Sequence, residues 1–130
     1  MGAKFYLCKR CGNLIGMVHD SGVVPVCCGE SMTALDANTV EASREKHLPV
    51  VDVEAKDCGT VLHVRVGSVD HPMIDAHYIE WIFVECEHGG QRRALRPGDA
   101  PKADFVIPAD NKAIAVYAYC NLHGLWKTVL

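Results

Sequence analysis

A thiol and an imidazole stand three residues apart near the end of the sequence, as Cys120 and His123, and Gly124 follows directly. The glycine permits a tight turn, and the apolar run over 113–119 predicts a strand leading into that turn. A thiolate and an imidazole on one turn can reach the same metal ion. Three further histidines lie in comparable settings, close to a proline or to the start of a predicted strand: His47, His71 and His77.

Together these residues offer four imidazoles and one thiolate, which is one donor more than zinc prefers. A mixed nitrogen set with one thiolate suits iron that must react with a small molecule. A solvated surface histidine is the alternative interpretation of each imidazole. The loop that His71 shares with His77, and the pairing of His123 with Cys120, favour metal binding. The remaining histidines are interpreted as solvated or packing residues: His19, His63 and His88.

Four cysteines near the N-terminus form a second candidate site. Cys8 and Cys11 have the C-x-x-C spacing, and the adjacent pair Cys27 and Cys28 follows after a gap of fifteen residues. A segment of this size is too small to be stabilised by a core, so a metal ion is expected to hold it together. Four thiolates suit zinc or iron, and both remain open. Adjacent cysteines cannot chelate as a second C-x-x-C would, and we expect a distorted tetrahedron.

The composition limits the classes of protein in which these sites can occur. The chain has 130 residues, 49% of them hydrophobic, and a net charge of −3. A core is therefore expected, while a nucleic-acid partner is not, because phosphate binding needs a basic surface. No apolar run reaches the length of a membrane span, and no apolar signal region precedes Cys8. Seven cysteines in a cytoplasmic protein indicate metal binding rather than disulfides, with Cys58 and Cys86 interpreted as reduced, packed thiols.

The pattern beyond the cysteine-rich segment predicts an all-β domain. Seven short strands alternate with turn signals, which is typical of an immunoglobulin-like sandwich: residues 50–54, 60–66, 78–86, 91–95, 103–107, 113–120 and 125–129. In the third of these strands we expect Ile79, Trp81 and Phe83 to share one face. The predicted organisation is a metal domain over 1–36, a linker over 37–49 and the sandwich over 50–130.

The linker carries a charged pair, Glu45 and Lys46, directly before His47. Pro49 keeps Leu48 extended, so His47 is expected in a loop rather than a helix. A solvated ion pair is the plain interpretation of Glu45 and Lys46. The functional interpretation is that the lysine attracts an anionic substrate and the carboxylate acts as a replaceable metal ligand.

Taken in combination, these motifs resemble desulfoferrodoxin, the two-iron superoxide reductase family, over nearly the whole chain. The resemblance rests on five segments: Cys8-x-x-Cys11 with Cys27-Cys28, Glu45-Lys46-His47-x-Pro49, His71-Pro72-Met73, His77 to Trp81, and Cys120 to Trp126. It implies a desulforedoxin-type iron held by the first four cysteines. It also implies a second iron with an equatorial plane of histidines and Cys120 as the axial ligand; those histidines are His47, His71, His77 and His123. The family's catalytic charged pair falls on Glu45 and Lys46.

The same resemblance implies an activity and partners. Superoxide would be reduced to hydrogen peroxide without release of dioxygen, a rubredoxin-like protein would supply electrons, and the chain would form a homodimer. The N-terminal iron would be either an electron relay or structural. Two alternatives remain open: a cupredoxin-like electron carrier, which is disfavoured because no methionine follows His123, and a zinc-stapled binding module without catalysis.

Overall fold

The structure is a computed structural model and describes residues 2–130. The chain divides into two compact units, Met1–Asp36 and Ala37–Leu130. Residues 37–49, predicted as a linker, fall within the second unit, and the predicted domain boundaries stay a prediction. Among the described residues, no helix is long and apolar enough to span a membrane.

The first unit consists of very short strands. A three-stranded sheet has the order β2-β1-β5, and a two-stranded ribbon joins β3 to β4. Their bounds are Phe5–Leu7 for β1, Leu14–Gly16 for β2, Val26–Cys27 for β3, Glu30–Ser31 for β4 and Thr33–Ala34 for β5. Among the described residues, one buried cluster of this unit consists of Tyr6, Cys8 and Met32. So small a core supplies little hydrophobic stabilisation, as the sequence predicted.

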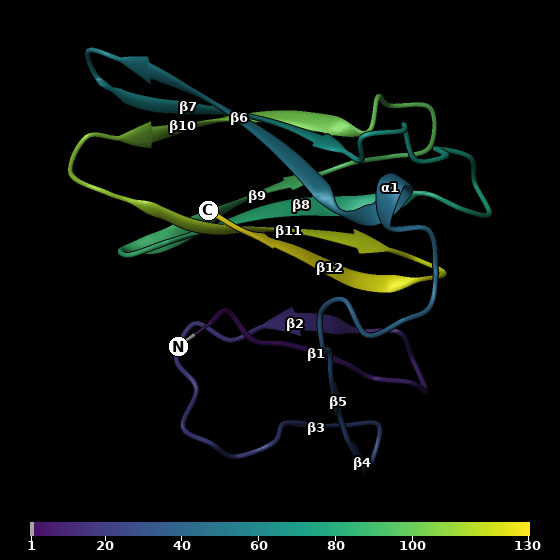
Figure 1. Cartoon of the computed structure of the whole chain (residues 1–130). Coiled ribbons are helices and arrows are strands. Elements are labelled where there is room, and N and C mark those ends of the chain that lie inside the picture. The colour runs from purple at the N-terminus through teal and green to yellow at the C-terminus, as the bar shows by residue number, and fades with distance from the viewer. Residues whose placement is uncertain (1) are drawn as a thin grey trace. The chain divides into compact units, whose positions relative to one another are not determined.

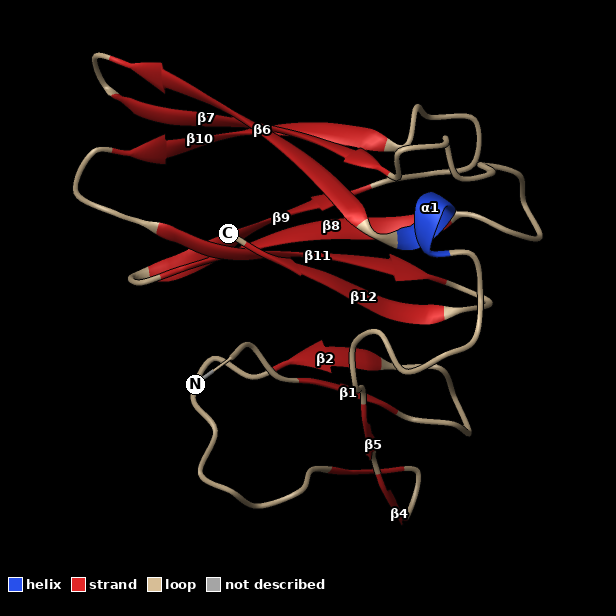
Figure 2. Ribbon diagram, in the orientation of Figure 1, coloured by secondary structure: helices blue, strands red, loops and turns tan. Residues whose placement is uncertain are grey.

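The second unit is a seven-stranded sandwich, which confirms the predicted fold class (Figures 1 and 2). One sheet has the order β10-β7-β6 and the other the order β12-β11-β8-β9. The strand bounds are Pro49–Lys56 for β6, Gly59–Val66 for β7, Ile79–Cys86 for β8, Gly89–Ala94 for β9, Lys102–Pro108 for β10, Ala113–Cys120 for β11 and Gly124–Val129 for β12.

The core of the sandwich lies between the two sheets. Leu62, Val64 and Val66 alternate along β7 and are at most 2% exposed, as the period of two predicted. Cys86 also belongs to this core cluster, in agreement with its interpretation as a packed thiol. Cys58 does not, because it lies exposed in the turn between β6 and β7, so the prediction for that residue was wrong.

A β-bulge near the start of β8 overturns the expectation that Ile79, Trp81 and Phe83 share one face. Cys120 is opposite Ile79, whereas the preceding residue of β11 is opposite Trp81, so Glu80 is an extra residue in the pairing. An extra residue inverts the alternation on either side of it. Ile79 therefore lies in the core, while the Trp81 ring stacks on Tyr119 at 5.6 Å.

The prediction that His47 lies in a loop was also wrong. His47 is the last residue of α1, a single helical turn over Arg44–His47. Pro49 restricts only the residue directly before it, and Leu48 is indeed extended, with φ −67° and ψ 124°. The turn is closed by the N–H of Leu48, which donates to the Arg44 carbonyl at 2.9 Å.

Asn38 attaches the segment before α1 to the edge strand β12. Its backbone N–H donates to the Leu125 carbonyl at 3.0 Å. Its side-chain amide accepts from the N–H of Lys127 at 2.9 Å and donates to the carbonyl of the same residue at 3.1 Å. Asn38 has a positive φ of 63°, a conformation that asparagine tolerates better than most residues. Part of the exposed edge of β12 is thereby covered.

Candidate metal centres

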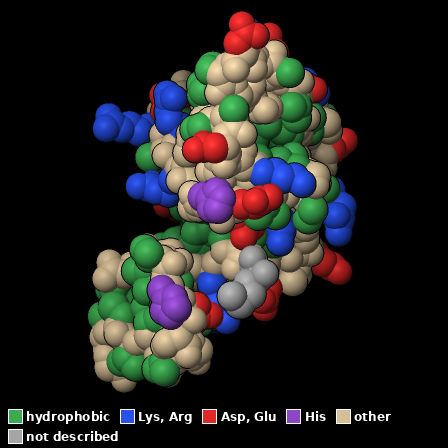
Figure 3. Space-filling view, turned by 90° about the vertical axis from the view of Figure 1, so that its left-hand side faces the viewer, with side chains coloured by type: hydrophobic (Ala, Val, Ile, Leu, Met, Phe, Trp, Pro, Cys, Tyr) green, Lys and Arg blue, Asp and Glu red, His purple; other side chains and the backbone are tan. Residues whose placement is uncertain are grey.

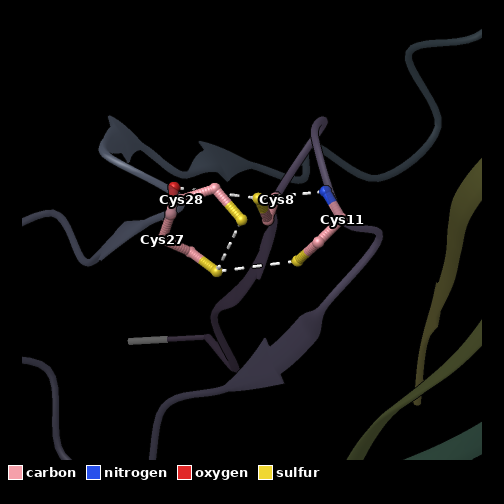
Figure 4. A group of neighbouring side chains, drawn as sticks. All are labelled: Cys8, Cys11, Cys27 and Cys28. Carbon is pink, nitrogen blue, oxygen red and sulfur yellow. Dashed lines mark hydrogen bonds between the residues drawn. The ribbon is translucent and has the colours of Figure 1, made fainter.

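The sulfur atoms of the four N-terminal cysteines converge (Figure 4). All of the Sγ atoms of Cys8, Cys11, Cys27 and Cys28 lie within 4.8 Å of one another. Adjacent cysteines in an extended strand would point to opposite faces. Cys28 instead has a positive φ of 53°, which brings its Sγ to 4.0 Å from that of Cys27. The left-handed backbone thus allows neighbouring residues to contribute to one site.

Backbone hydrogen bonds favour the thiolate form of Cys8. The backbone N–H of Cys11 donates to Sγ of Cys8 at 3.5 Å. This bond is the main reason that the pKa of Cys8 is lowered to about 6. The N–H of Asn13 donates to Sγ of Cys11 at 3.4 Å. The pKa of Cys28 is raised to about 12, because its hydrogen bonds with Cys11 and Cys8 favour the protonated thiol. A divalent cation would replace the shared protons and stabilise all four thiolates.

The second candidate site lies at one end of the sandwich, where α1 precedes β6, the β7–β8 loop ends at β8, and β11 turns into β12 (Figure 1). The ligand atoms of four residues lie within 4.8 Å of one another, namely those of His47, His77, Cys120 and His123. His71 is not one of these four, but its Nε2 lies 3.2 Å from Nε2 of His47. The structure therefore gathers all five of the residues singled out in this half of the sequence.

The four imidazole rings form a nearly square arrangement. Around its edges the ring centroids are 4.7 Å apart for His47 and His71, and 4.6 Å apart for His71 and His77. The other two edges are 5.1 Å, from His77 to His123, and 5.0 Å, from His123 back to His47. Neighbouring rings are close to perpendicular, whereas the diagonal pair His47 and His77 is 6.4 Å apart and tilted by only 32°.

Backbone carbonyls determine which nitrogen of two of the rings faces inward. Nδ1 of His47 lies 2.6 Å from the Ser43 carbonyl, and Nδ1 of His71 lies 2.7 Å from the Pro72 carbonyl. Because a carbonyl can only accept, each Nδ1 carries the proton and each Nε2 is a free lone pair. Two such lone pairs 3.2 Å apart repel unless a proton or a cation lies between them.

His77 provides the clearest indication of a metal. Its Nε2 is buried and has no hydrogen-bond partner among the described residues. A buried polar atom of this kind carries a free-energy penalty unless a ligand satisfies it. Burial lowers the pKa of His77, and it lowers the pKa of His71 to about 4, so both rings are neutral near pH 7. Neutral imidazole is the form that binds a metal ion.

Cys120 contributes the thiol. It is fully buried, and its Sγ lies 4.0 Å from Nδ1 of His123. Burial raises the pKa of this thiol, while the backbone N–H groups of His123 and Leu122 act in the opposite direction. The alternation of β11 places Cys120 on the core face with Val116 and Ala118, opposite Ile79. A buried thiol surrounded by imidazoles provides a mixed sulfur and nitrogen donor set that suits a transition-metal ion.

Trp126 supports two of the candidate ligands from a buried position. Its ring stacks on His47 at 4.9 Å, and its Nε1–H donates to the His123 carbonyl at 3.1 Å. The side chain is 1% exposed. A tryptophan three residues after a candidate ligand on a predicted strand is equally typical of a core residue, so the sequence carried no specific signal.

Glu45 and Lys46 lie exposed on α1, next to the site rather than among its ligands. The pKa of His47 and that of His77 are lowered mainly by burial and also by the positive charge of Lys46. Because Lys46 directly precedes His47 in α1, its positive charge belongs to the surroundings of the imidazole square. On the face of the molecule that Figure 3 shows, cationic and anionic side chains are interspersed.

The turn that carries these residues rests on the β7–β8 loop. The Glu45 carbonyl accepts from the N–H of Val69 at 2.9 Å and from the hydroxyl of Ser68 at 3.2 Å. Gly67 makes the close approach possible. A Cβ at that position would lie 2.6 Å from the Glu45 carbonyl oxygen and 2.9 Å from that of Leu48.

The sequence did not reveal a separate cluster of titratable side chains, which consists of one histidine and two carboxylates. His63, interpreted as a solvated or packing residue, lies between two carboxylates on neighbouring strands. Its Nδ1 is 2.8 Å from Asp104 and its Nε2 is 3.1 Å from Glu54, so both nitrogens donate. These hydrogen bonds, first that to Glu54, raise the pKa of His63. Only the pairing of three strands brings these residues together, and no local motif encodes it.

A small unit with four converging cysteines, together with a β-sandwich that holds four imidazoles around a thiol, defines a metalloprotein with two different centres. Residues 39–129 match the family model described as Desulfoferrodoxin. The chain belongs to the desulfoferrodoxin family, and the resemblance found in the sequence is confirmed.

Relatives cover both parts of the chain. A desulfoferrodoxin homologue of Archaeoglobus fulgidus is 43% identical over 125 residues, which are 96% of this chain and 95% of that protein. The desulfoferrodoxin of Nitratidesulfovibrio vulgaris is 42% identical, over 95% of this chain and 94% of its own length. The crystal structure of the superoxide reductase from Treponema pallidum matches with a TM-score of 0.80 and 35% identity, over 98% of this chain and 99% of that one.

Proposed function

We propose that this protein is a superoxide reductase that converts superoxide to hydrogen peroxide at an iron centre in the sandwich, as a defence against oxidative stress. The observation that carries the proposal is the buried Nε2 of His77, which has no partner among the described residues and belongs to a square of imidazoles beside the Cys120 thiol. Several relatives support it, because they are named desulfoferrodoxin or superoxide reductase.

Five residues would hold the iron: His47, His71, His77, His123 and Cys120. Five donors exceed the tetrahedral preference of zinc, and one thiolate with several imidazoles suits iron. When bound there, iron supplies the single electron that superoxide takes up together with two protons to become hydrogen peroxide. Cys120, which is fully buried, would supply a thiolate that donates electron density to such a metal.

Glu45 and Lys46 would serve the substrate. Superoxide is an anion, and the chain has a net charge of −3, so attraction must be local. Lys46 is exposed on the turn that ends in His47, and its charge already acts on two of the imidazoles. It would attract superoxide to the site. Glu45, one residue earlier, would act after the electron has been transferred, as a replaceable carboxylate ligand.

The remaining assignments belong to the same proposal. The N-terminal site would hold a second iron as Fe(Cys)4, with the ligands Cys8, Cys11, Cys27 and Cys28. Four thiolates can bind either zinc or iron, and iron is proposed because of the family resemblance. A rubredoxin-like protein would return the electron, and the protein would act as a homodimer in the cytoplasm. The sulfur-rich sites are compatible with a reducing compartment, where thiols remain available for metals.

The proposal is tested with purified, iron-loaded protein reduced by a chemical donor and mixed with pulse-generated superoxide. We expect about two irons per chain, in keeping with the ligand sets, and one hydrogen peroxide per superoxide consumed with no dioxygen released. Release of dioxygen would indicate dismutation instead. A preparation that binds one copper, or zinc alone, and that leaves superoxide unchanged would favour the cupredoxin-like carrier or the binding module.

A further inference from the structure

Asn121 connects two ligand-bearing segments that are far apart in the chain. It directly follows Cys120, and its side-chain amide contacts the backbone on both sides of His77. Oδ1 accepts from the N–H of Tyr78 at 3.0 Å, and Nδ2 donates to the Ala76 carbonyl at 3.0 Å. The backbone N–H of Asn121 donates in addition to the Tyr78 carbonyl at 3.2 Å.

The backbone of His77 itself is held from the other side. Its N–H donates to the Ile74 carbonyl at 3.0 Å, and its carbonyl accepts from the N–H of Ile74 at 3.1 Å. With both neighbours bonded to Asn121, the residues directly before and after His77 are each held by the turn that carries Cys120. Of these hydrogen bonds around His77, the two made by the Asn121 amide depend on a side chain, and the others join backbone groups.

We propose that Asn121 is a positioning residue: by bracketing His77, it sets the distance between the His77 imidazole and the ligands Cys120 and His123. This inference rests on the proposed function only in that the same five residues bind a metal. It concerns the metal affinity of the chain and not the reaction itself.

The His77 ring is the one that needs such support. Nδ1 of His47 and Nδ1 of His71 are hydrogen-bonded to carbonyls, and these bonds fix the orientation of both rings. The inward Nε2 of His77 has no partner among the described residues, so the placement of this ring depends more on its backbone. Groups that orient a metal ligand typically change metal affinity or activity by about 10- to 100-fold when they are removed.

The chain contains a matched control. Asn111 brackets the backbone of another histidine, His88, through the same two kinds of bond. Its Oδ1 accepts from the His88 N–H at 3.0 Å, and its Nδ2 donates to the His88 carbonyl at 3.5 Å. His88 lies in the turn between β8 and β9, at the opposite end of β8 from His77. Asn111→Ala therefore removes a comparable loop contact without touching a ligand.

Cobalt(II) titration of the full chain measures the effect. The thiolate-to-cobalt absorption that is lost in Cys120→Ser reports the sandwich centre separately from the cysteine cluster. We expect Asn121→Ala to weaken cobalt binding by about 10- to 100-fold and Asn111→Ala to leave it unchanged. Asn121→Asp, which keeps the acceptor for Tyr78 but loses the donor to Ala76, should fall between the two and provides the comparison if the alanine variant does not fold.

A double-mutant cycle separates positioning from general stability. If Asn121 acts through His77, Asn121→Ala should have less than about a twofold further effect on cobalt binding in a His77→Ala background. Equal losses in both backgrounds, or equal affinities for Asn121→Ala and Asn111→Ala, would overturn the proposal. Because cobalt binding is read without superoxide, a failure of the proposed reaction leaves this test intact.

Discussion

The two candidate centres differ in what supports them. Around the four N-terminal cysteines, strands are two or three residues long and the buried cluster comprises three residues. Around the imidazole square, the strands are up to eight residues long and pack on a continuous hydrophobic core. In the first unit a metal would hold the polypeptide in place, whereas in the sandwich the polypeptide holds the metal ligands in place.

The same difference appears in the electrostatics. At the cysteine cluster, Cys11 and Cys28 are exposed and backbone N–H groups stabilise thiolate charge. At the sandwich site, burial lowers the pKa of His47, His71 and His77, and Nε2 of His77 has no hydrogen-bond partner among the described residues. A cluster of thiolates depends on its cation for charge balance, while neutral imidazoles require only that their rings be correctly placed.

The largest effect is expected from a substitution that disrupts only the N-terminal cysteine site. Cys8→Ser removes one of four thiolates, and structural metal sites of this kind contribute on the order of 10 kcal/mol to folding. We expect residues 2–36 to lose protection from hydrogen exchange while the core of the sandwich keeps it. Superoxide reduction by a chemical donor should persist. Cys58→Ser, at an exposed thiol, is the control, and loss of protection throughout the chain would show that the two units depend on one another.

The second largest effect is expected from Cys120→Ser. It replaces a soft anionic ligand by a hydroxyl that stays protonated, so the thiolate-to-iron absorption should vanish and the reaction with superoxide should slow by about 100-fold or more. Cys86→Ser changes another buried thiol of the same core cluster and should leave both signals in place. A Cys120→Ser variant with the wild-type absorption and rate would move the thiolate to another cysteine.

Gly67→Ala should disturb the sandwich site through its supporting loop. The added methyl group would meet the carbonyl oxygens of Glu45 and Leu48, and overpacking of this kind costs about 1–3 kcal/mol. We expect a lower urea midpoint together with weaker metal binding, because α1 must shift. Ser68→Ala removes only a hydroxyl bond to the same Glu45 carbonyl and should have a much smaller effect. Unchanged metal binding in Gly67→Ala would show that α1 adapts freely.

Lys46→Ala should affect only the encounter with substrate. The rate of reaction with superoxide should fall by about tenfold at low salt, and the difference should shrink as ionic strength rises. The absorption of the metal site should not change. Lys112→Ala removes the same charge beside the β8–β9 turn, far from α1 along both sheets, and is the control. Equal rates and salt slopes for the two variants would make Lys46 an ordinary surface residue.

The smallest effect is expected at His63, where neighbouring carboxylates raise the imidazole pKa, whereas burial lowers the pKa of His71. The folded-state pKa of His63 is raised by Glu54 and Asp104, so its contribution to stability is fully present below the unfolded pKa of about 6.5 and is lost as pH rises through the folded value. Thermal unfolding should therefore separate the original chain from His63→Gln at pH 5.5 and bring them together at pH 8.5. A gap that widens with pH would contradict this sign.

The strands and the candidate ligands of this protein could be proposed from the sequence because they are encoded locally. Alternation along residues 60–66 identifies β7, and the placement of His71, His77, Cys120 and His123 around loops singles them out as ligands. Their assignment to one site also drew on the family resemblance. What could not be predicted depends on pairing between strands. The bulge at Glu80, the bracket formed by Asn121 and the cluster around His63 exist only once the register is set.

The single helical turn of α1 could not be predicted from the sequence for a different reason. Residues 44–47 contain no helical period long enough to detect, and isolated turns are unstable without tertiary contacts. The turn forms because the Glu45 carbonyl is bonded to the loop at Ser68 and Val69 and because Gly67 leaves room for it. Those contacts come from a segment more than twenty residues away.

His47 and His123 are 76 positions apart in the sequence, yet their ring nitrogens lie 3.1 Å apart. This separation affects when each centre can form during synthesis. Contacts between distant segments form late, because the intervening chain must first be ordered. The cysteine cluster spans residues 8–28 and can capture a metal while the ribosome is still producing the sandwich. The imidazole square is complete only after β11 has paired and the final turn has emerged. A chain stalled before His123 should thus carry a loaded first centre and an empty second one, which metal analysis of ribosome-bound chains would measure.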